Sequence, residues 1–214
     1  METEQLIASL GQGLSPVKPL RPPQWRALLW LASVAVLVLL VVLRFADLAA
    51  MARRVAQPRQ ALECVGALLT GIVAVISAFY LSLPDRSDRW RFAPLPPLAL
   101  WLACSGLGCL QNGLGLGPAG HRLGESTGCF RFILAVSVPT ALLLFAVLRR
   151  ARPLLPLRVA LCGALGVAAL AAFVLQFFHP FDVTLIDLAM HALAVVLVVG
   201  IAGLFRRVTL SPAA

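Results

Sequence analysis

The chain has 214 residues, of which 60% belong to the hydrophobic classes and only 13% are charged, and its mean hydropathy is +0.93. A soluble domain carries about 25% charged residues because water must wet its surface. The composition therefore excludes a water-soluble enzyme, a disordered chain and a disulfide-stapled secreted scaffold. The net charge of +9 is explained by basic loops facing anionic headgroups. We predict an all-α polytopic membrane protein without direct nucleic-acid binding.

The N-terminal segment, residues 1–24, is predicted to be cytoplasmic, with a short amphipathic helix followed by a proline-rich spacer. Four apolar side chains fall within an arc of about 100° on that helix, and these are Leu6, Ile7, Leu10 and Leu14. So short a helix is marginal alone, so it needs a surface to dock on. The segment has two acids and no base before Lys18, which suits an anionic membrane poorly. Docking on a partner protein is therefore preferred to a position along the inner leaflet.

Six apolar stretches follow, and each is predicted to be a membrane-spanning helix. They are Ala27–Leu43, Cys64–Leu83, Leu95–Leu110, Phe132–Leu148, Val159–Phe178 and Val183–Phe205. Their apolar runs are continuous rather than alternating, which favours helices over strands. The first, third and fourth are shorter than the roughly 20 residues that a span needs, so we expect these helices to include flanking residues. The prediction is a six-helix bundle over residues 25–207, followed by a C-terminal tail at 208–214.

The Lys and Arg residues of the short loops predict which way the bundle crosses the membrane. With a cytoplasmic N-terminus, twelve of the 18 Lys and Arg residues lie on the inner side and six on the outer side. Cytoplasmic loops carry an excess of Lys and Arg, so both termini are expected in the cytoplasm. The predicted first outer loop, Arg44–Glu63, is the exception because it holds four arginines.

Cysteine and histidine residues provide the candidate chemistry of the outer side. Cys109 and Cys129 flank a glycine-rich loop, but the chain has no C-x-x-C motif. Cys129 and His179 are a soft and a borderline ligand for a divalent metal ion such as zinc. Asp187 and His191 are four residues apart and share one face of the last predicted span. Ionisable groups inside a membrane are costly, so this pair is either a proton, metal or gating site or a polar contact between helices.

Catalytic motifs are absent from the sequence. Residues 115–120 match G-x-G-x-x-G, but no strand precedes them and no helix follows, so they are not a dinucleotide site. We therefore predict no enzyme activity, no catalytic residue and no small-molecule substrate. Two alternatives stay open: a quinone-linked thiol-disulfide oxidoreductase that uses Cys109 and Cys129, and a small transporter that uses Asp187 and His191. The transporter ranks last because no convincing internal repeat supports it.

Short motifs along nearly the whole chain also resemble one protein family. The motifs are Leu6-Ile7-x-x-Leu10, Pro16-Val17, Leu20-Arg21-Pro22-Pro23, Pro94-Leu95-Pro96-Pro97-Leu98-Ala99-Leu100-Trp101, Leu107-Gly108-Cys109, Cys129 before Arg131-Phe132-Ile133, Pro180-x-Asp182 and His191-Ala192-Leu193-Ala194-Val195. In this pattern the chain resembles the NrsF family of bacterial six-span inner-membrane anti-sigma factors.

The resemblance implies a function and a partner. Members of this family hold an extracytoplasmic-function sigma factor at the membrane and release it when the envelope signals an oxidant or a heavy metal. The cytoplasmic N-terminal segment is the implied contact with the sigma factor. Carried over position by position, Leu6, Ile7 and Leu10 fall on this contact segment.

The resemblance also implies a sensing site on the envelope side. Cys129 falls on the first sensing cysteine of the family, and the second falls on position 179, where this chain has His179. A disulfide between these two positions is therefore excluded. The alternatives are a metal site formed by Cys129 and His179, or a redox pair of Cys129 with Cys109.

Overall fold

The computed structural model describes residues 3–12, 19–115, 123–178 and 185–210, with the side chains at 109, 111–115, 123–126 and 185–187 outside that description. Over these residues the chain is helical and contains no strand, as the continuous apolar runs predict. In chain order the elements are α1 (Thr3–Gly11), α2 (Pro23–Phe45), α3 (Leu48–Val55), α4 (Pro58–Leu81), η1 (Asp88–Phe92), α5 (Leu95–Gly115), α6 (Leu123–Leu148), η3 (Arg149–Ala151), α7 (Pro156–Leu175), α8 (Leu185–Leu204) and α9 (Arg206–Leu210).

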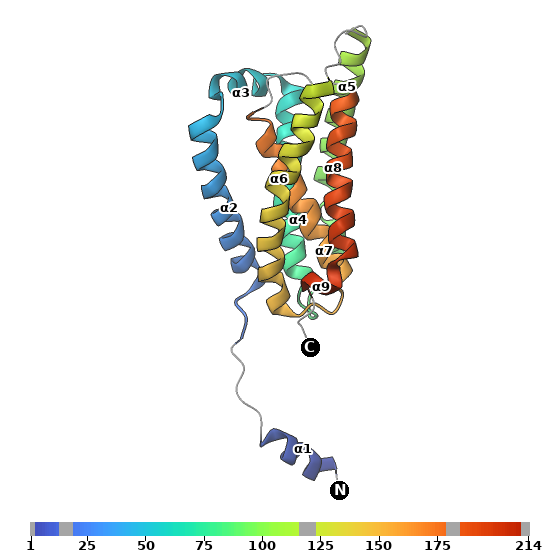
Figure 1. Ribbon diagram of the computed structural model, residues 1–214. Helices are drawn as coiled ribbons and strands as arrows, with labels where there is room; N and C mark the ends of the chain where they lie inside the picture. Colours follow the sequence, from blue (N-terminus) through green and yellow to red (C-terminus); the bar gives the residue numbers. More distant parts are fainter. Residues whose placement is uncertain (1–2, 13–18, 116–122, 179–184, 211–214) are drawn as a thin grey trace.

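The long helices lie side by side as a bundle, and the short helix α3 lies across one of its ends (Figure 1). We call the end that carries α3 the distal end. The opposite end, which holds η1, η3 and α9, is the proximal end. Helix α2 begins and helix α9 ends at the proximal end, as expected for an even number of passes along the bundle.

Proline at the first helical position begins three of the long helices. Helix α2 begins at Pro23, α4 at Pro58 and α7 at Pro156. Proline suits this position because the first N–H groups of a helix have no intrahelical acceptor, and because its φ is already helical. Helix α6 instead contains Pro139 in its interior, where the ring removes one backbone hydrogen bond.

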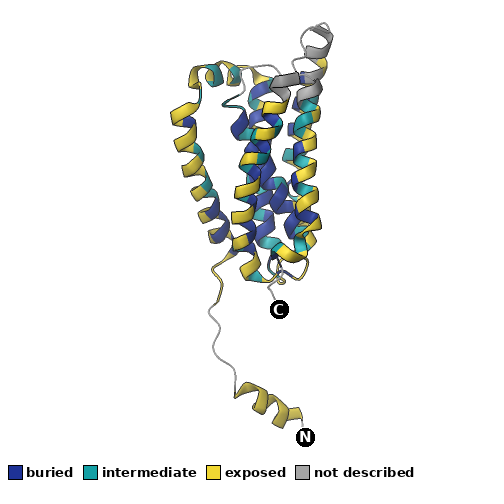
Figure 2. Cartoon of the chain, in the orientation of Figure 1, coloured by how far each residue is buried: buried dark blue, intermediate teal, exposed yellow. Residues whose placement is uncertain are grey.

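Helices α4 and α7 form the centre of the bundle and approach each other closely. A Cβ at Gly71 would lie 2.6 Å from Leu170 Cγ, and a Cβ at Gly166 would lie 2.8 Å from Val75 Cγ2. Small residues at these positions let the two helices come together, as is common where helices associate in membranes. Most residues of α7 are buried (Figure 2).

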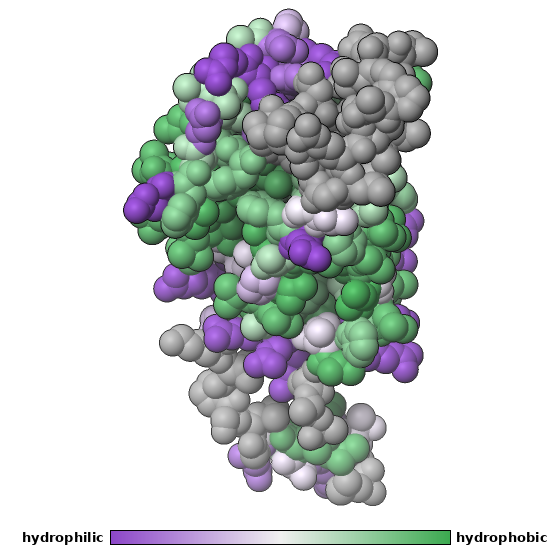
Figure 3. All heavy atoms as spheres, turned by 45° about the horizontal axis from the view of Figure 1, so that its top comes forward, coloured by the Kyte–Doolittle hydropathy of each residue, from purple (hydrophilic) through white to green (hydrophobic). Residues whose placement is uncertain are grey.

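Each of the six predicted apolar stretches coincides with one long helix. These helices are α2, α4, α5, α6, α7 and α8. Among the described residues four helices are long and apolar enough to cross a membrane: Pro23–Phe45, Pro58–Leu81, Thr127–Ala151 and Pro156–Leu175. On the face seen in Figure 3, apolar side chains form a broad band along the bundle, and most hydrophilic side chains lie towards its two ends. Helices α5 and α8 each include residues whose side chains are outside the description. The prediction that all six stretches are helical is therefore confirmed, and four of these helices also have the length and composition of a membrane span.

Helix α2 stands at the edge of the bundle. Only 17% of its most apolar window is buried, compared with 67% for α7, and most of the helix is exposed in Figure 2. Its buried residues are concentrated at the proximal end, where Arg26, Ala27 and Trp30 face the bundle. The helix is therefore attached mainly at its base, next to the N-terminal segment.

The segment 44–63, predicted as a loop, is largely helical, and this part of the prediction was wrong. Asp47 Oδ1 accepts a hydrogen bond of 2.9 Å from the amide of Ala50 and so caps the start of α3. Pro58 then begins α4 six residues before the predicted apolar stretch. The capping aspartate and the proline that begins α4 are local signals, and a search for continuous apolar runs does not detect them.

Candidate functional site

Helix α1 presents its apolar side chains to solvent. Leu6 is 41% exposed, Ile7 and Leu10 are each 64% exposed, and every residue of the helix is exposed. The helix ends at Gly11, whose backbone freedom weakens helices. Leu14, the fourth predicted contact residue, lies outside the described residues. Because so short a helix is marginal alone, its exposed apolar side chains indicate a docking surface.

The described part of the spacer, residues 19–22, connects this helix to α2 and contains no helix or strand. Pro22 has φ −49° and ψ 143°, which lies in the polyproline II region. The spacer is thus extended where it meets the bundle, as its proline content predicts.

Arg26 fastens the base of α2 to the bundle. Its Nη2 atom donates a hydrogen bond of 3.0 Å to the carbonyl of Val147 on α6. Its guanidinium carbon lies 5.3 Å from the ring centroid of Phe79 on α4, within the range of a cation–π interaction. The N-terminal segment therefore leaves the bundle at a fixed point.

Cys129 lies near the distal end of α6 and is 4% exposed. It belongs to a buried apolar cluster that includes Trp101, Ile133 and alanines of α7. Cys109 lies on α5, but its side chain is outside the described residues, as is all of His179. The structure thus places Cys129 in a buried apolar position and does not describe its distances to the other two predicted sensing residues.

A comparison with protein-family models decides the family. The model described as NrsF, negative regulator of sigma F, matches residues 10–211. The chain belongs to this family. No curated protein and no solved structure matches it.

The NrsF family name describes a negative regulator of a sigma factor, which is a regulatory and not an enzymatic function. A sigma factor is therefore the partner of the family, and the prediction of an anti-sigma factor is confirmed at that level. The match begins at residue 10, so Leu6 and Ile7 precede it. Their assignment as contact residues depends on the exposure of α1 and on the sequence pattern.

This NrsF-family chain also contains a buried polar cluster that the sequence analysis missed. Glu63 on α4 is 4% exposed. Its Oε1 atom accepts a hydrogen bond of 2.9 Å from Ser105 Oγ on α5, and its Oε2 atom lies 3.5 Å from Arg59 Nη1. The same Arg59 nitrogen donates to the carbonyl of Cys104 at 3.4 Å. A Cβ at Gly108 would clash with Arg59 Nη1, so glycine leaves the room that this arginine occupies.

The cluster joins the distal ends of α4 and α5, and a sequence signal for it existed. Arg59 and Glu63 are four residues apart, the spacing of an ion pair on one helix face. They were predicted to lie in a loop because the apolar stretch begins only at Cys64. Burial of a carboxylate is tolerated when the charge is paired and hydrogen-bonded, and both partners are present here.

The remaining predicted polar residues lie on α8. Asp187 and His191 are both helical and one turn apart, and His191 is half-buried, while the Asp187 side chain is outside the described residues. No group of three or more His, Cys, Asp and Glu side chains that could hold a metal ion occurs in the part of the chain that the structure describes. Cys104 and Cys162 are buried and free, consistent with a packing role.

Proposed function

We propose that this chain is a multi-pass protein of the bacterial inner membrane that sequesters an extracytoplasmic-function sigma factor through α1. The observation that carries the proposal is the exposed apolar face of α1. Leu6, Ile7, Leu10 and, beyond the described residues, Leu14 are the proposed contacts. An amphipathic helix that lays its apolar face into a groove of a partner is a common mode of recognition.

The proposed membrane arrangement has six spans and both termini in the cytoplasm. Four helices with the length and composition of spans support it, as does the apolar band on the face of the bundle seen in Figure 3. The proximal end carries the larger share of arginines, including those of η1 and η3. An excess of arginine marks cytoplasmic loops, so α1 would emerge on the side where sigma factors act.

The proposed signal is an oxidant or a divalent metal ion that acts at the envelope side. Cys129 and His179 are the proposed sensing residues, with Cys109 as the alternative redox partner of Cys129. Thiolate and imidazole would together bind a metal such as zinc. The burial of Cys129 requires that the signal reaches it through a local opening of the distal end. A shift in helix packing there would release the sigma factor.

Crosslinking followed by co-purification tests the contact between α1 and the sigma factor. The tagged full-length chain should recover a sigma factor, and Leu6→Asp/Leu10→Asp should abolish recovery because charged side chains cannot enter an apolar groove. The matched control, Gln5→Asp/Ser9→Asp, adds the same two charges to the opposite face and should retain the partner. Equal recovery by both double variants would contradict the proposal.

A second experiment separates sensing from sequestration. Cys129→Ser should keep the sigma factor bound and should lose its release by an oxidant or metal, measured as transcription from a sigma-dependent promoter. Cys162→Ser, at a buried cysteine of α7, is the control and should respond normally. A normal response of the Cys129 variant would remove this residue from the sensing site.

A further inference from the structure

An open cavity of about 530 Å³ lies at the proximal end, between the base of α2 and the end of α6. Three of its lining residues are arginines, Arg21, Arg26 and Arg150, and none is acidic. In the part of the chain that the structure describes, these arginines form no salt bridge. Arg150 is close enough to Arg26 to repel it electrostatically. The cavity therefore concentrates positive charge without an internal counterion.

Two residues that line this cavity each have a buried hydrogen-bond donor without an acceptor. Arg26 is 8% exposed and Trp30 is 7% exposed. Arg26 Nη1 and Trp30 Nε1 have no hydrogen-bond partner among the described residues. Leaving a buried donor without an acceptor is costly, and more so when the group is charged. An anionic group in the cavity would offset the positive charge of the arginines, and a small rearrangement of the Arg26 side chain would give its free donor an acceptor.

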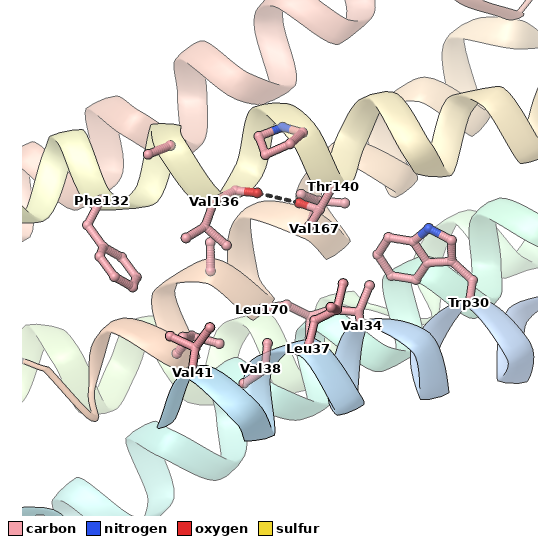
Figure 4. A pocket seen from close by; sticks show the side chains of 14 residues that line it. Trp30, Val34, Leu37, Val38, Val41, Phe132, Val136, Thr140, Val167 and Leu170 are labelled. Carbon is pink, nitrogen blue, oxygen red and sulfur yellow. Dashed lines mark hydrogen bonds between the residues drawn. The ribbon is translucent and has the colours of Figure 1, made fainter. Parts of the chain in front are cut away.

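An apolar cavity of about 280 Å³ continues along the bundle from Trp30, which lines both spaces. Figure 4 shows Val34, Leu37 and Val41 of α2 facing Phe132 and other side chains of α6 across it. The cavity contains almost no polar surface, and the hydroxyl of Thr140 donates a hydrogen bond to the carbonyl of Val136 on its own helix (Figure 4).

The geometry points to a binding site for an anionic phospholipid in the groove between α2 and α6. The phosphate of the headgroup binds Arg21, Arg26 and Arg150, and one acyl chain lies along the apolar cavity beyond Trp30. Basic sites between helices on the cytoplasmic side bind anionic headgroups, and guanidinium groups pair well with phosphate oxygens. The site rests on the proposed membrane arrangement, in which the proximal end faces the cytoplasm. A bound lipid would fix α2, and thus the start of the spacer, to the bundle.

Binding of defined lipids to the purified full-length chain in neutral detergent tests this site. Phosphatidylglycerol should remain bound in native mass spectrometry and should raise the melting temperature, whereas phosphatidylcholine with the same acyl chains should do neither. Arg150→Gln should weaken phosphatidylglycerol binding about tenfold, the loss expected for one charge-assisted hydrogen bond. Arg149→Gln changes the adjacent exposed arginine, which does not line the cavity, and should bind normally.

The apolar half of the site has its own matched pair of variants. Leu37→Trp fills the cavity and should weaken lipid binding, while Leu40→Trp alters an exposed residue of α2 outside the cavity and should not. Both positions are exposed, so both variants should fold. Soluble glycerol phosphate, which lacks acyl chains, should not raise the melting temperature at the same concentration.

Three results would overturn the lipid site: equal binding of the two lipids, equal loss in the Arg149 and Arg150 variants, or full stabilisation by glycerol phosphate. Alkaline extraction of the membranes that contain the chain distinguishes failure of the lipid site from failure of the proposed function. Release of the chain by alkali would overturn the membrane arrangement. A chain that stays in the membrane but does not discriminate between the lipids overturns the lipid site alone.

Discussion

Helices α2 and α7 are both apolar enough to cross a membrane, yet they differ in what they contact. The most apolar stretch of α2 is more hydrophobic than that of α7, and it is far less buried. Helix α7 carries small residues such as Gly163 and Gly166 towards its neighbours, whereas the middle of α2 is made of Leu and Val that remain exposed. In lipid the hydrophobic effect does not draw apolar helices together, and close packing does. Hydropathy therefore identifies a span, and small residues identify which spans form the core.

The largest expected effect comes from disrupting the α4–α7 contact. Gly166→Leu places side-chain atoms against Val75, including its backbone nitrogen, which lies 2.9 Å from an ideal Cβ at this position. Overpacking of this kind should lower the free energy of unfolding by about 3 kcal/mol. Thermal unfolding in detergent measures it. Gly200→Leu is the matched control, because a Cβ there meets no atom within 4 Å, and equal destabilisation of both variants would refute the packing argument.

The buried polar cluster at the distal end should give the next largest effect. Glu63→Ala removes the acceptor for Ser105 and leaves Arg59 without its carboxylate. We expect a loss of about 2 kcal/mol, below the range for a fully buried pair because the Arg59 side chain is 24% exposed. Glu63→Gln keeps an acceptor for Ser105 and should lose about half as much. Unfolding midpoints that match the wild type would show that the cluster is not stabilising.

A smaller effect is expected at the base of α2. Arg26→Met removes the hydrogen bond to Val147 and the contact with the Phe79 ring, but retains an apolar side chain. The expected loss is about 1 kcal/mol, together with faster amide hydrogen exchange in the first turns of α2. Arg44→Met, at the distal end of the same helix, is the control and should change neither quantity.

The smallest effect is expected on the outer face of α2. Leu40→Ala changes a side chain that is 62% exposed, so the free energy of unfolding should change by no more than about 0.5 kcal/mol. Phe79→Ala, at a fully buried position, should cost far more than Leu40→Ala in the same assay and about as much as Gly166→Leu. If the two changes had similar effects, the contrast between the peripheral helix and the core would be lost.

The long helices could be predicted from the sequence because a continuous apolar run long enough to cross a membrane has few structural alternatives to a helix. The short helix before Gly11 was also predictable, since its apolar residues recur at helical spacing. The same runs do not tell which helices pack together. That information lies in Gly71 and Gly166, whose partners are distant in the sequence and come close only in the folded bundle.

The candidate site was predicted less completely. The exposed face of α1 agrees with the pattern of Leu6, Ile7 and Leu10, but Arg59 and Glu63 were assigned to a loop. Charged residues interrupt a hydropathy profile, so a helix that begins with them appears to start later than it does. The basic cavity at the base of α2 could not be predicted, because Arg26 and Arg150 are brought together by packing between distant segments.

The position of Leu210 has a consequence for the order of biosynthesis. This residue is fully buried in the core, on a helix that packs against α6, α7 and α8. A ribosome makes α1 first and Leu210 only after every helix that it contacts. The proposed partner-binding segment α1 is therefore made before the proximal end of the bundle can close. If α1 binds the sigma factor as proposed, the nascent chain offers that helix before its bundle has finished folding.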